Sequence, residues 1–295
     1  MSLEGVFSVL PTPFYPDSSL DLASLRRVVD LYIGAGVNGL TALGVTSEVA
    51  RLTESERGAV LDTVLAQVNG RVPVVAGTSA EGLQVCIEFS RNARAAGASA
   101  VMVSPPRMPK LNSDAVVKGY AALADAMDLD IVIQDYPPVS GYAMEPALLA
   151  RIAREVGPAK TIKLEDPPTP FKTARILEQA QGMKLNILGG LGGVFLLEEL
   201  MAGAAGVMTG FAYPEILVEV VKAYRGGDMQ HAAEVFYGNV ALMRFEFQEG
   251  IGMSIRKEML RRRGAFESNT IRRPGALLDA GTLRALDQIL RWAGR

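Results

Sequence analysis

The sequence predicts an α/β fold, a (β/α)8 TIM barrel with a C-terminal helical appendage, and three observations support this prediction. Eight short runs rich in Val, Ile and Thr alternate with stretches of helical periodicity. The runs start about 20 to 35 residues apart, which is the spacing of successive strand–helix units. They are apolar almost throughout instead of alternating, as parallel strands buried on both faces are.

The expected strands and helices alternate as far as residue 225. The strands fall at residues 5–14, 39–47, 72–79, 98–106, 130–138, 161–166, 185–190 and 206–213. A barrel built from them spans residues 1–225. A doubly wound open sheet is the alternative, but no G-x-G-x-x-G follows the first strand, which argues against a dinucleotide-binding fold.

The helices between the strands carry their own start signals. Asp21 or Ser24 is a candidate N-cap of the first helix. Thr53 and Glu56 have the spacing of a capping box at the start of the second helix. Ser79 is expected to cap the third helix, so each of these helices begins shortly after a strand.

Residues 226–295 show only helical patterns and form the expected appendage. The patterns lie at residues 231–248, 250–264 and 279–294. Each carries an apolar stripe that a free helix would expose to water, so this region is expected to pack against the barrel.

Composition excludes several kinds of function. The net charge is −2 and the only dense basic run is Arg261 to Arg263, so no nucleic-acid partner is expected. Cys86 is the only cysteine and lies in an apolar helical stretch, which predicts a small buried side chain. His231 is the only histidine and is expected at the surface, so no metal site is predicted.

Two further features argue against a membrane or secreted protein. No run of 18 residues lacks a charge. The N-terminal segment has neither a basic n-region nor a cleavage site. The expectation is a soluble, cytoplasmic protein.

In a barrel, the chemistry collects at the carboxyl ends of the strands, so the polar residues and glycines there are the candidates. They are Thr46, Ser47, Glu48, Gln134, Asp135, Tyr136, Lys163, Glu165, Gly189 to Gly193, Thr209, Gly210 and Tyr213.

Lys163 is the most informative of these residues, because it lies in a short apolar strand with Glu165 on the same face. Burial favours the neutral amine, which attacks a ketone to form a Schiff base. The protonated imine is an electron sink for breaking a bond at the neighbouring carbon, and no external cofactor is needed. Position alone leaves open a lysine that only forms a salt bridge with Glu165.

Four segments together resemble the dihydrodipicolinate synthase / N-acetylneuraminate lyase superfamily of pyruvate-type class I aldolases. "GVTSEVARL" at 44–52 is similar to the family's G-x-T-G-E-x-x-x-L loop, and "IKLED" at 162–166 to its Schiff-base strand. "QDYPPVSG" at 134–141 lies where the family has Y-N-V-P-x-R-T-G, and "LGGLGG" at 188–193 where it has a glycine motif.

The resemblance implies a homotetrameric barrel in which Lys163 forms a Schiff base with a small-molecule 2-oxo acid. Thr46 and Ser47 would hold the substrate carboxylate through their hydroxyl and backbone N–H groups. The other expected substrate contacts are Gln134, Gly190 and Gly210.

The departures from the family pattern bear on the substrate. Dihydrodipicolinate synthases use a hydroxyl relay of one threonine and two tyrosines, and here Val45, Gln134 and Arg107 stand at those positions. Val139 replaces the arginine that follows the strand-5 proline. The condensing chemistry of the lysine pathway is therefore disfavoured. Arg107 either supplies a positive charge for the distal end of the substrate or faces water.

Two residues are candidates to move protons in place of this relay. Tyr136 lies two positions beyond Gln134 on the same strand face and offers a phenol. Glu165 lies roughly 6–7 Å from Lys163 along the strand, which leaves room for a substrate carbon and hydroxyl between them. Their alternatives are an aromatic ring packed at the barrel rim and a tuning partner for the lysine.

A carboxyl beside the Schiff base suits a dehydratase, which removes a proton from C3 and helps a hydroxyl to leave. The motifs "KLEDPP", "GGLGG" and "GFAYPE" are most similar to 2-keto-3-deoxy sugar acid dehydratases of the L-2-keto-3-deoxyarabonate type. The lead hypothesis is therefore a lyase that dehydrates such an acid through Lys163.

Three alternatives remain open. A pyruvate-releasing aldolase, or a condensing enzyme like dihydrodipicolinate synthase, would use the same lysine. A phosphate-handling barrel would use the glycine-rich loops after strands 7 and 8, but these contain no Lys or Arg. A noncatalytic 2-oxo acid sensor could dispense with Lys163.

Overall fold

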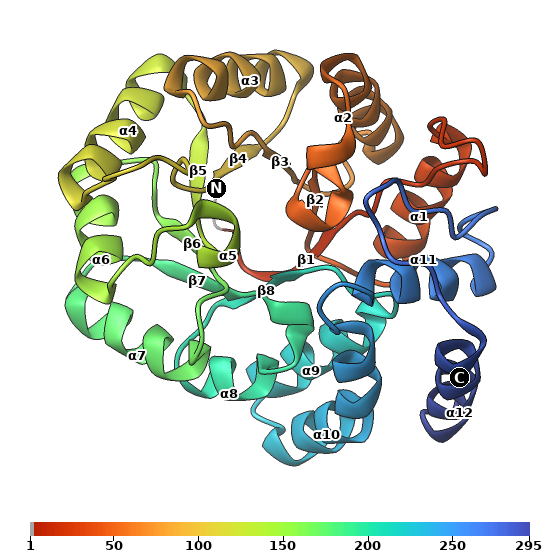
Figure 1. Ribbon diagram of the computed structural model, residues 1–295. Coiled ribbons are helices and arrows are strands. Elements are labelled where there is room, and N and C mark those ends of the chain that lie inside the picture. Colours follow the sequence, from red (N-terminus) through yellow and green to blue (C-terminus); the bar gives the residue numbers. More distant parts are fainter. Residues whose placement is uncertain (1–2) are drawn as a thin grey trace.

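The computed structural model describes residues 3–295 and confirms the predicted (β/α)8 barrel with a C-terminal helical region (Figure 1). Eight parallel strands close the barrel in chain order, with β1 paired to β8. The strands are β1 (Gly5–Val9), β2 (Gly39–Ala42), β3 (Val74–Gly77), β4 (Ala100–Val103), β5 (Asp130–Asp135), β6 (Thr161–Leu164), β7 (Asn186–Gly189) and β8 (Gly206–Thr209).

Helices surround the strands and continue beyond them. The α-helices of the barrel are α1 (Leu22–Gly34), α2 (Glu54–Val68), α3 (Leu83–Ala96), α4 (Ser113–Ala126), α5 (Pro137–Ser140), α6 (Pro146–Glu155), α7 (Thr169–Gln179), α8 (Leu196–Met201) and α9 (Pro214–Arg225). Three short 3-10 helices lie in the loops after β2 and β7, namely η1 (Val45–Ser47), η2 (Val49–Arg51) and η3 (Leu191–Gly193). The C-terminal helices are α10 (Met229–Glu246), α11 (Gly252–Arg262) and α12 (Ala280–Trp292).

The inside of the barrel is an apolar plug beneath the carboxyl ends of the strands. Its buried members come from alternate positions of six strands and from the segment before β1, as the two-residue period of a strand requires. They are Leu3, Phe7, Val9, Val75, Ala100, Met102, Val132, Leu188 and Met208. The plug fills the barrel below the carboxyl ends of the strands, so an open site can lie only above it.

Two of the three predicted helix starts are confirmed. The Asp21 carboxylate caps α1 by accepting from Ser24 N at 2.8 Å, and Thr53 and Glu56 form the capping box of α2. The prediction for Ser79 is wrong. Helix α3 begins after Gly82, and the Ser79 hydroxyl instead accepts from the backbone N–H of the neighbouring β4 loop.

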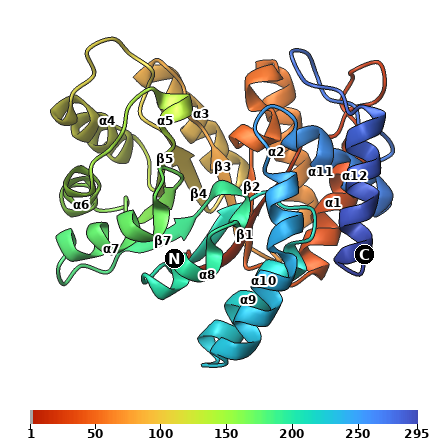
Figure 2. The same cartoon turned by 60° about the horizontal axis from the view of Figure 1, so that its bottom comes forward.

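The C-terminal helices lie on one flank of the barrel, with α10 packed against α8 and α9 (Figure 2). A buried ion pair between Arg256 of α11 and Glu246 of α10 fastens them. The second oxygen of Glu246 accepts from Ala212 N, just after β8, at 2.9 Å. The appendage is thereby tied to the end of a barrel strand.

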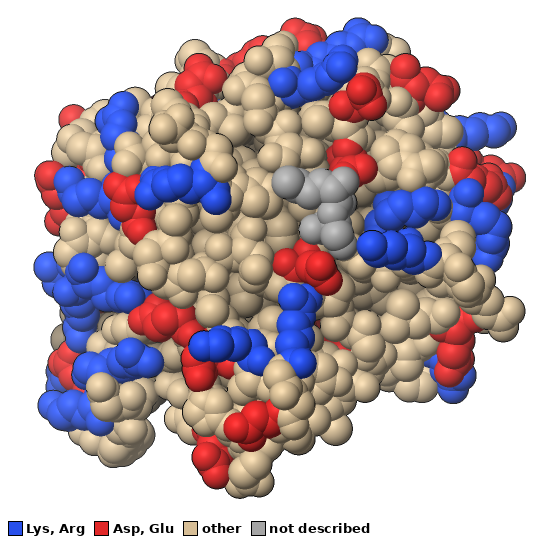
Figure 3. All heavy atoms as spheres, turned by 180° about the vertical axis from the view of Figure 1, so that it is seen from behind, with Lys and Arg blue, Asp and Glu red and all other residues tan. Residues whose placement is uncertain are grey.

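Charges of both signs are interspersed on the face opposite to that of Figure 1 (Figure 3). The arginines of the basic run form ion pairs, since Arg261 and Arg262 both pair with Glu258, and Arg263 pairs with Glu215. Within residues 3–295, no helix is long and apolar enough to cross a membrane.

Glu199 of α8 is a buried acid with an unusual titration, and it predicts a pH-dependent stability. Burial raises the pKa of Glu199 to about 7, although Thr169 Oγ1 donates to it at 2.5 Å. The folded protein therefore binds this proton more tightly than the unfolded chain. The bound proton on Glu199 therefore stabilises the fold. This stabilisation is complete below the unfolded pKa near 4.5 and is lost as the pH rises through about 7.

Glu199→Gln removes this titration and keeps an acceptor for Thr169. We expect the variant to be more stable than the parent by up to about 3 kcal/mol at pH 8, and much closer to it at pH 5. Thermal unfolding at both pH values, with the exposed Glu178→Gln on α7 as control, measures the difference. An equal effect at pH 5 and pH 8 would contradict the assignment.

Candidate active site

The site lies at the carboxyl ends of β3 to β6, where inward-facing side chains rise above the apolar plug. Gln134 of β5 and Lys163 of β6 are direct neighbours across the two strands. A pocket of about 370 Å³ is bordered by Gln134, and also by Val45 and Ser104. Polar inward-facing side chains therefore gather at the strand ends, where the site was predicted.

Lys163 is 3% exposed, and its ammonium contacts Glu165 Oε2 at 3.1 Å. The expected gap between the two groups is absent, because the 6–7 Å strand spacing separates backbones whereas these side chains bend toward each other. The contact thus occupies the space that was expected to hold a substrate carbon and hydroxyl. The arrangement gives the lysine an immediate proton acceptor.

Gln134 completes a chain of hydrogen bonds that ends on the same carboxylate oxygen. Its Nε2 donates to Glu165 Oε2 at 2.8 Å, and its Oε1 accepts from Ser104 Oγ at 3.0 Å. The Ser104 backbone N–H donates to Ser79 Oγ at 2.9 Å. Because an ionised carboxylate only accepts, Glu165 orients the NH₂ group of Gln134 toward itself, and the Ser104 hydroxyl donates to the other end of the amide.

Ser104 and Ser79 were missed as site residues in the sequence. Their positions could have identified them, since Ser104 follows the carboxyl end of β4 and Ser79 that of β3. A serine is so common in loops that its residue type gave no warning.

The loop after β2 contains the predicted carboxylate-binding residues. The Ser47 hydroxyl donates to Leu10 O at 2.5 Å and accepts from Gly44 N at 3.0 Å, and Ser47 N donates to Gly44 O at 2.9 Å. By contrast, the Thr46 hydroxyl is buried without a hydrogen-bond partner in residues 3–295. Of the pair, Thr46 is thus the residue with an unsatisfied group for a ligand.

Glu48 anchors this loop from below. Its backbone is left-handed at φ 58°, and its carboxylate forms a buried ion pair with Lys257 of α11. Burial lowers the pKa of Lys257 to about 8 although Glu48 opposes the shift. Lys257 also donates to Thr270 O at 2.8 Å, so the C-terminal region holds the loop that carries Thr46.

Tyr136 and Gly190 both approach Glu165. Tyr136 is half-buried just beyond β5, and burial raises its pKa, with Glu165 adding a smaller electrostatic contribution in the same direction. A Cβ on Gly190 would lie 2.2 Å from Glu165 Cγ, so only glycine leaves room for this carboxylate. Gly210 does not approach Glu165 in this way. A Cβ on Gly210 would meet the guanidinium of Arg256.

The three other departures from the family pattern lie at the mouth of the pocket. Val45, Arg107 and Val139 all border it, and Val45 and Val139 are 37% and 38% exposed. They present no hydroxyl toward Glu165.

Within the described residues, no three His, Cys, Asp or Glu side chains gather as a metal site would require.

Comparison with known proteins now decides the family. The profile of the dihydrodipicolinate synthetase family matches residues 2–293. The chain belongs to this family. Its members work through a Schiff base, and the protein is a lyase of this class acting on a small molecule.

Two curated family members illustrate the range of activities. L-2-keto-3-deoxyarabonate dehydratase of Azospirillum brasilense is 34% identical, over 98% of this chain and 96% of its own length. A 4-hydroxy-tetrahydrodipicolinate synthase of Methanoculleus marisnigri is 31% identical, over 86% of this chain and 87% of its own.

The fold also matches solved structures of the family. The dihydrodipicolinate synthase of Rhodopseudomonas palustris has a TM-score of 0.92 at 33% identity, covering 98% of this chain and 97% of that one. YagE of Escherichia coli K12, solved in complex with pyruvate, has a TM-score of 0.92 at 25% identity, covering 99% and 98%.

Proposed function

We propose that this family member dehydrates a 2-keto-3-deoxy sugar acid through a Schiff base on Lys163. The observation that supports this most is one carboxylate oxygen, Glu165 Oε2, which contacts Lys163 Nζ at 3.1 Å and Gln134 Nε2 at 2.8 Å. A single acid held in this way can serve both the lysine and the carbon next to the imine.

The first step joins the substrate to the enzyme. Lys163 must lose a proton before its nitrogen can attack the C2 carbonyl, and Glu165 is the adjacent acceptor. The nitrogen forms a bond to C2, and the carbonyl oxygen leaves as water to give the protonated imine. The substrate carboxylate would lie at Thr46, whose buried hydroxyl has no other partner in residues 3–295.

Elimination then follows at the next two carbons. Glu165 takes a proton from C3, and the electron pair flows into the imine to give an enamine. The enamine expels the C4 hydroxyl, which leaves as water after receiving a proton from the same carboxyl. Hydrolysis of the remaining imine by one water frees Lys163, so the net change in the substrate is the loss of one water.

Gln134 favours this reaction over aldol cleavage. Cleavage of the C3–C4 bond needs a base on the C4 hydroxyl, and an amide whose Oε1 is occupied by Ser104 is a poor base. The 34% identity to a sugar acid dehydratase supports the same choice. Aldol cleavage remains the second candidate, because the half-buried phenol of Tyr136 is within the electrostatic influence of Glu165.

Product analysis tests the proposal. The enzyme is incubated with a panel of 2-keto-3-deoxy sugar acids of four to six carbons, and the products are identified by NMR and mass spectrometry. The expected product is an oxo acid lighter than its substrate by one water. Pyruvate together with an aldehyde would instead establish the aldolase.

The homotetramer and the cytoplasmic location remain proposals that rest on family likeness. A family structure described as a monomeric dihydrodipicolinate synthase variant matches this chain with a TM-score of 0.92 at 27% identity. Light scattering of the purified protein measures the assembly directly, and a mass near that of one chain would contradict the tetramer.

A further inference from the structure

The pocket that borders Gln134, the strand neighbour of Lys163, extends away from the reacting lysine. It measures about 370 Å³ and runs from Gln134 and Ser104 across the loops after β2 to β5, to Arg57 in the first turns of α2. A 2-oxo acid with only three carbons would leave most of this space empty. The distal part of a longer substrate is the part that can occupy it.

Arg57 is an exception among the buried and half-buried arginines of residues 3–295. In residues 3–295, six other arginines are buried or half-buried, and the guanidinium of each binds a carboxylate. These are Arg27, Arg51, Arg151, Arg256, Arg263 and Arg272. Within the same residues, half-buried Arg57 makes neither an ion pair nor a side-chain hydrogen bond, and only stacks on the Phe89 ring at 4.4 Å.

Because no carboxylate of the described residues pairs with this half-buried guanidinium, it is free to pair with an anion of a ligand. Burial lowers the pKa of Arg57, and Glu54 one turn earlier offsets only part of this effect. Stacking on Phe89 fixes the plane of the guanidinium and leaves its N–H groups for an anion. A carboxylate is the partner whose two oxygens fit this fork.

A second cation borders the same pocket from the opposite loop. Arg107 lies against Gly141, where a Cβ would lie 3.6 Å from Arg107 Cγ, and its guanidinium has no ion pair in residues 3–295. Glu81 on the exposed rim is the one acidic side chain bordering the pocket. The balance at this end of the pocket is therefore positive.

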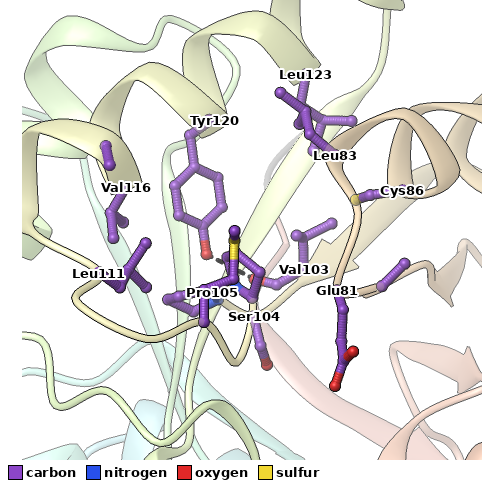
Figure 4. Close-up of a pocket in the computed structure, with 15 residues that line it drawn as sticks. Glu81, Leu83, Cys86, Val103, Ser104, Pro105, Leu111, Val116, Tyr120 and Leu123 are labelled. Carbon is purple, nitrogen blue, oxygen red and sulfur yellow. Dashed lines mark hydrogen bonds between the residues drawn. The ribbon is translucent and has the colours of Figure 1, made fainter.

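The neighbouring cavity between α3 and α4 is unsuited to such a ligand. It holds about 200 Å³ and is lined mainly by apolar side chains, with Tyr120 donating inward to Val103 O at 2.7 Å (Figure 4). The Cys86 thiol borders it, and burial raises the pKa of this thiol to about 11. In Figure 4 the Glu81 carboxylate points away from the apolar side chains that line this cavity.

We propose that Arg57 binds a second carboxylate at the distal end of the substrate, so the preferred substrates are 2-keto-3-deoxy acids with a carboxylate at both ends. The proposal rests on the Schiff-base dehydratase function proposed above. The C1 carboxylate lies at Thr46 and C2 at Lys163, and the rest of the chain passes Gln134 toward Arg57. Arg107 adds positive charge at the mouth.

The test compares two substrates of equal length, one ending in CH₂OH and the other in carboxylate, by the ratio of their kcat/KM values. We expect the wild type to prefer the diacid by about tenfold or more, the effect of a charge-assisted pair. Arg57→Met keeps the packing on Phe89 and is expected to lower the ratio about 10- to 100-fold. Arg57→Lys is expected to restore part of it.

Two further variants sharpen the result. Glu81→Gln removes the opposing charge and is expected to raise the ratio. Arg91→Met on α3, whose guanidinium donates to Ala126 O outside the pocket, is the matched control and should leave the ratio unchanged.

A wild type without preference for the diacid would overturn the proposal, as would an Arg57→Met variant that loses both activities in equal proportion. Borohydride trapping of pyruvate separates this failure from that of the proposed function, because pyruvate has no distal group. A trapped adduct without diacid preference rejects only the distal subsite. No adduct on the wild type rejects the Schiff-base function itself.

Discussion

Lys163→Ala is expected to abolish the adduct that pyruvate and sodium borohydride form with the protein, and to lower kcat by about 10⁴-fold or more. Alanine has no nitrogen to bond to C2, so the covalent route is lost as a whole. The experiment is intact-mass spectrometry of wild type and variant after reduction. The wild type should gain the mass of one reduced pyruvate per chain.

Two other lysines provide controls for this result. Lys160 precedes β6 at the opposite end of the strand, and Lys160→Ala should keep the adduct. Lys172 is buried, but Asp135 and Asp166 each hold its ammonium at 2.6 Å, which makes it the poorer nucleophile. Peptide mapping that places the adduct on Lys172 would contradict the assignment to Lys163.

The fold could be predicted because its signals are local and repeated. Each strand is an apolar run, and start signals such as the Thr53–Glu56 box lie within three residues of each other. The cap assigned to Ser79 failed for the opposite reason. A serine before a helix can cap it, but here the backbone N–H of Ser104, 25 residues away, takes its hydroxyl.

The site could be predicted only in part, for the same physical reason. Lys163 and Glu165 stand out because they interrupt an apolar strand. The ion pair between Glu48 and Lys257 gave no such sign, because its two partners lie far apart in the sequence and only the fold brings them together. The C-terminal region was expected only to cover apolar surface, yet it also supports the loop that carries Thr46.

The position of Gln134 illustrates what a resemblance can and cannot convey. Alignment with the family showed that a tyrosine was missing, and this disfavoured one reaction. It did not show that the amide would lie between Ser104 and Glu165 and bond to both. In the proposed reaction, Gln134 positions the acid Glu165 and transfers no proton itself.

Glu165→Gln gives the second large effect that the geometry predicts. Its amide keeps the volume and the contact to Gly190 but accepts no proton, so loss of the C3 proton should slow by about 10²- to 10⁴-fold, the contribution of a positioned acid or base. Imine formation should persist more slowly, since Lys163 can lose its proton to water. Single-turnover experiments that follow adduct mass and product release separately distinguish the two steps.

Tyr136→Phe is the matched variant for that experiment. If Glu165 moves both protons, Tyr136→Phe should lower dehydration by less than about tenfold, because it removes a hydroxyl that makes no hydrogen bond in residues 3–295. The reverse order of effects, with the phenylalanine variant inactive and the glutamine variant active, would assign proton transfer to the phenol. Glu165 would then only hold the ammonium of Lys163, and the case for aldol cleavage would become the stronger one.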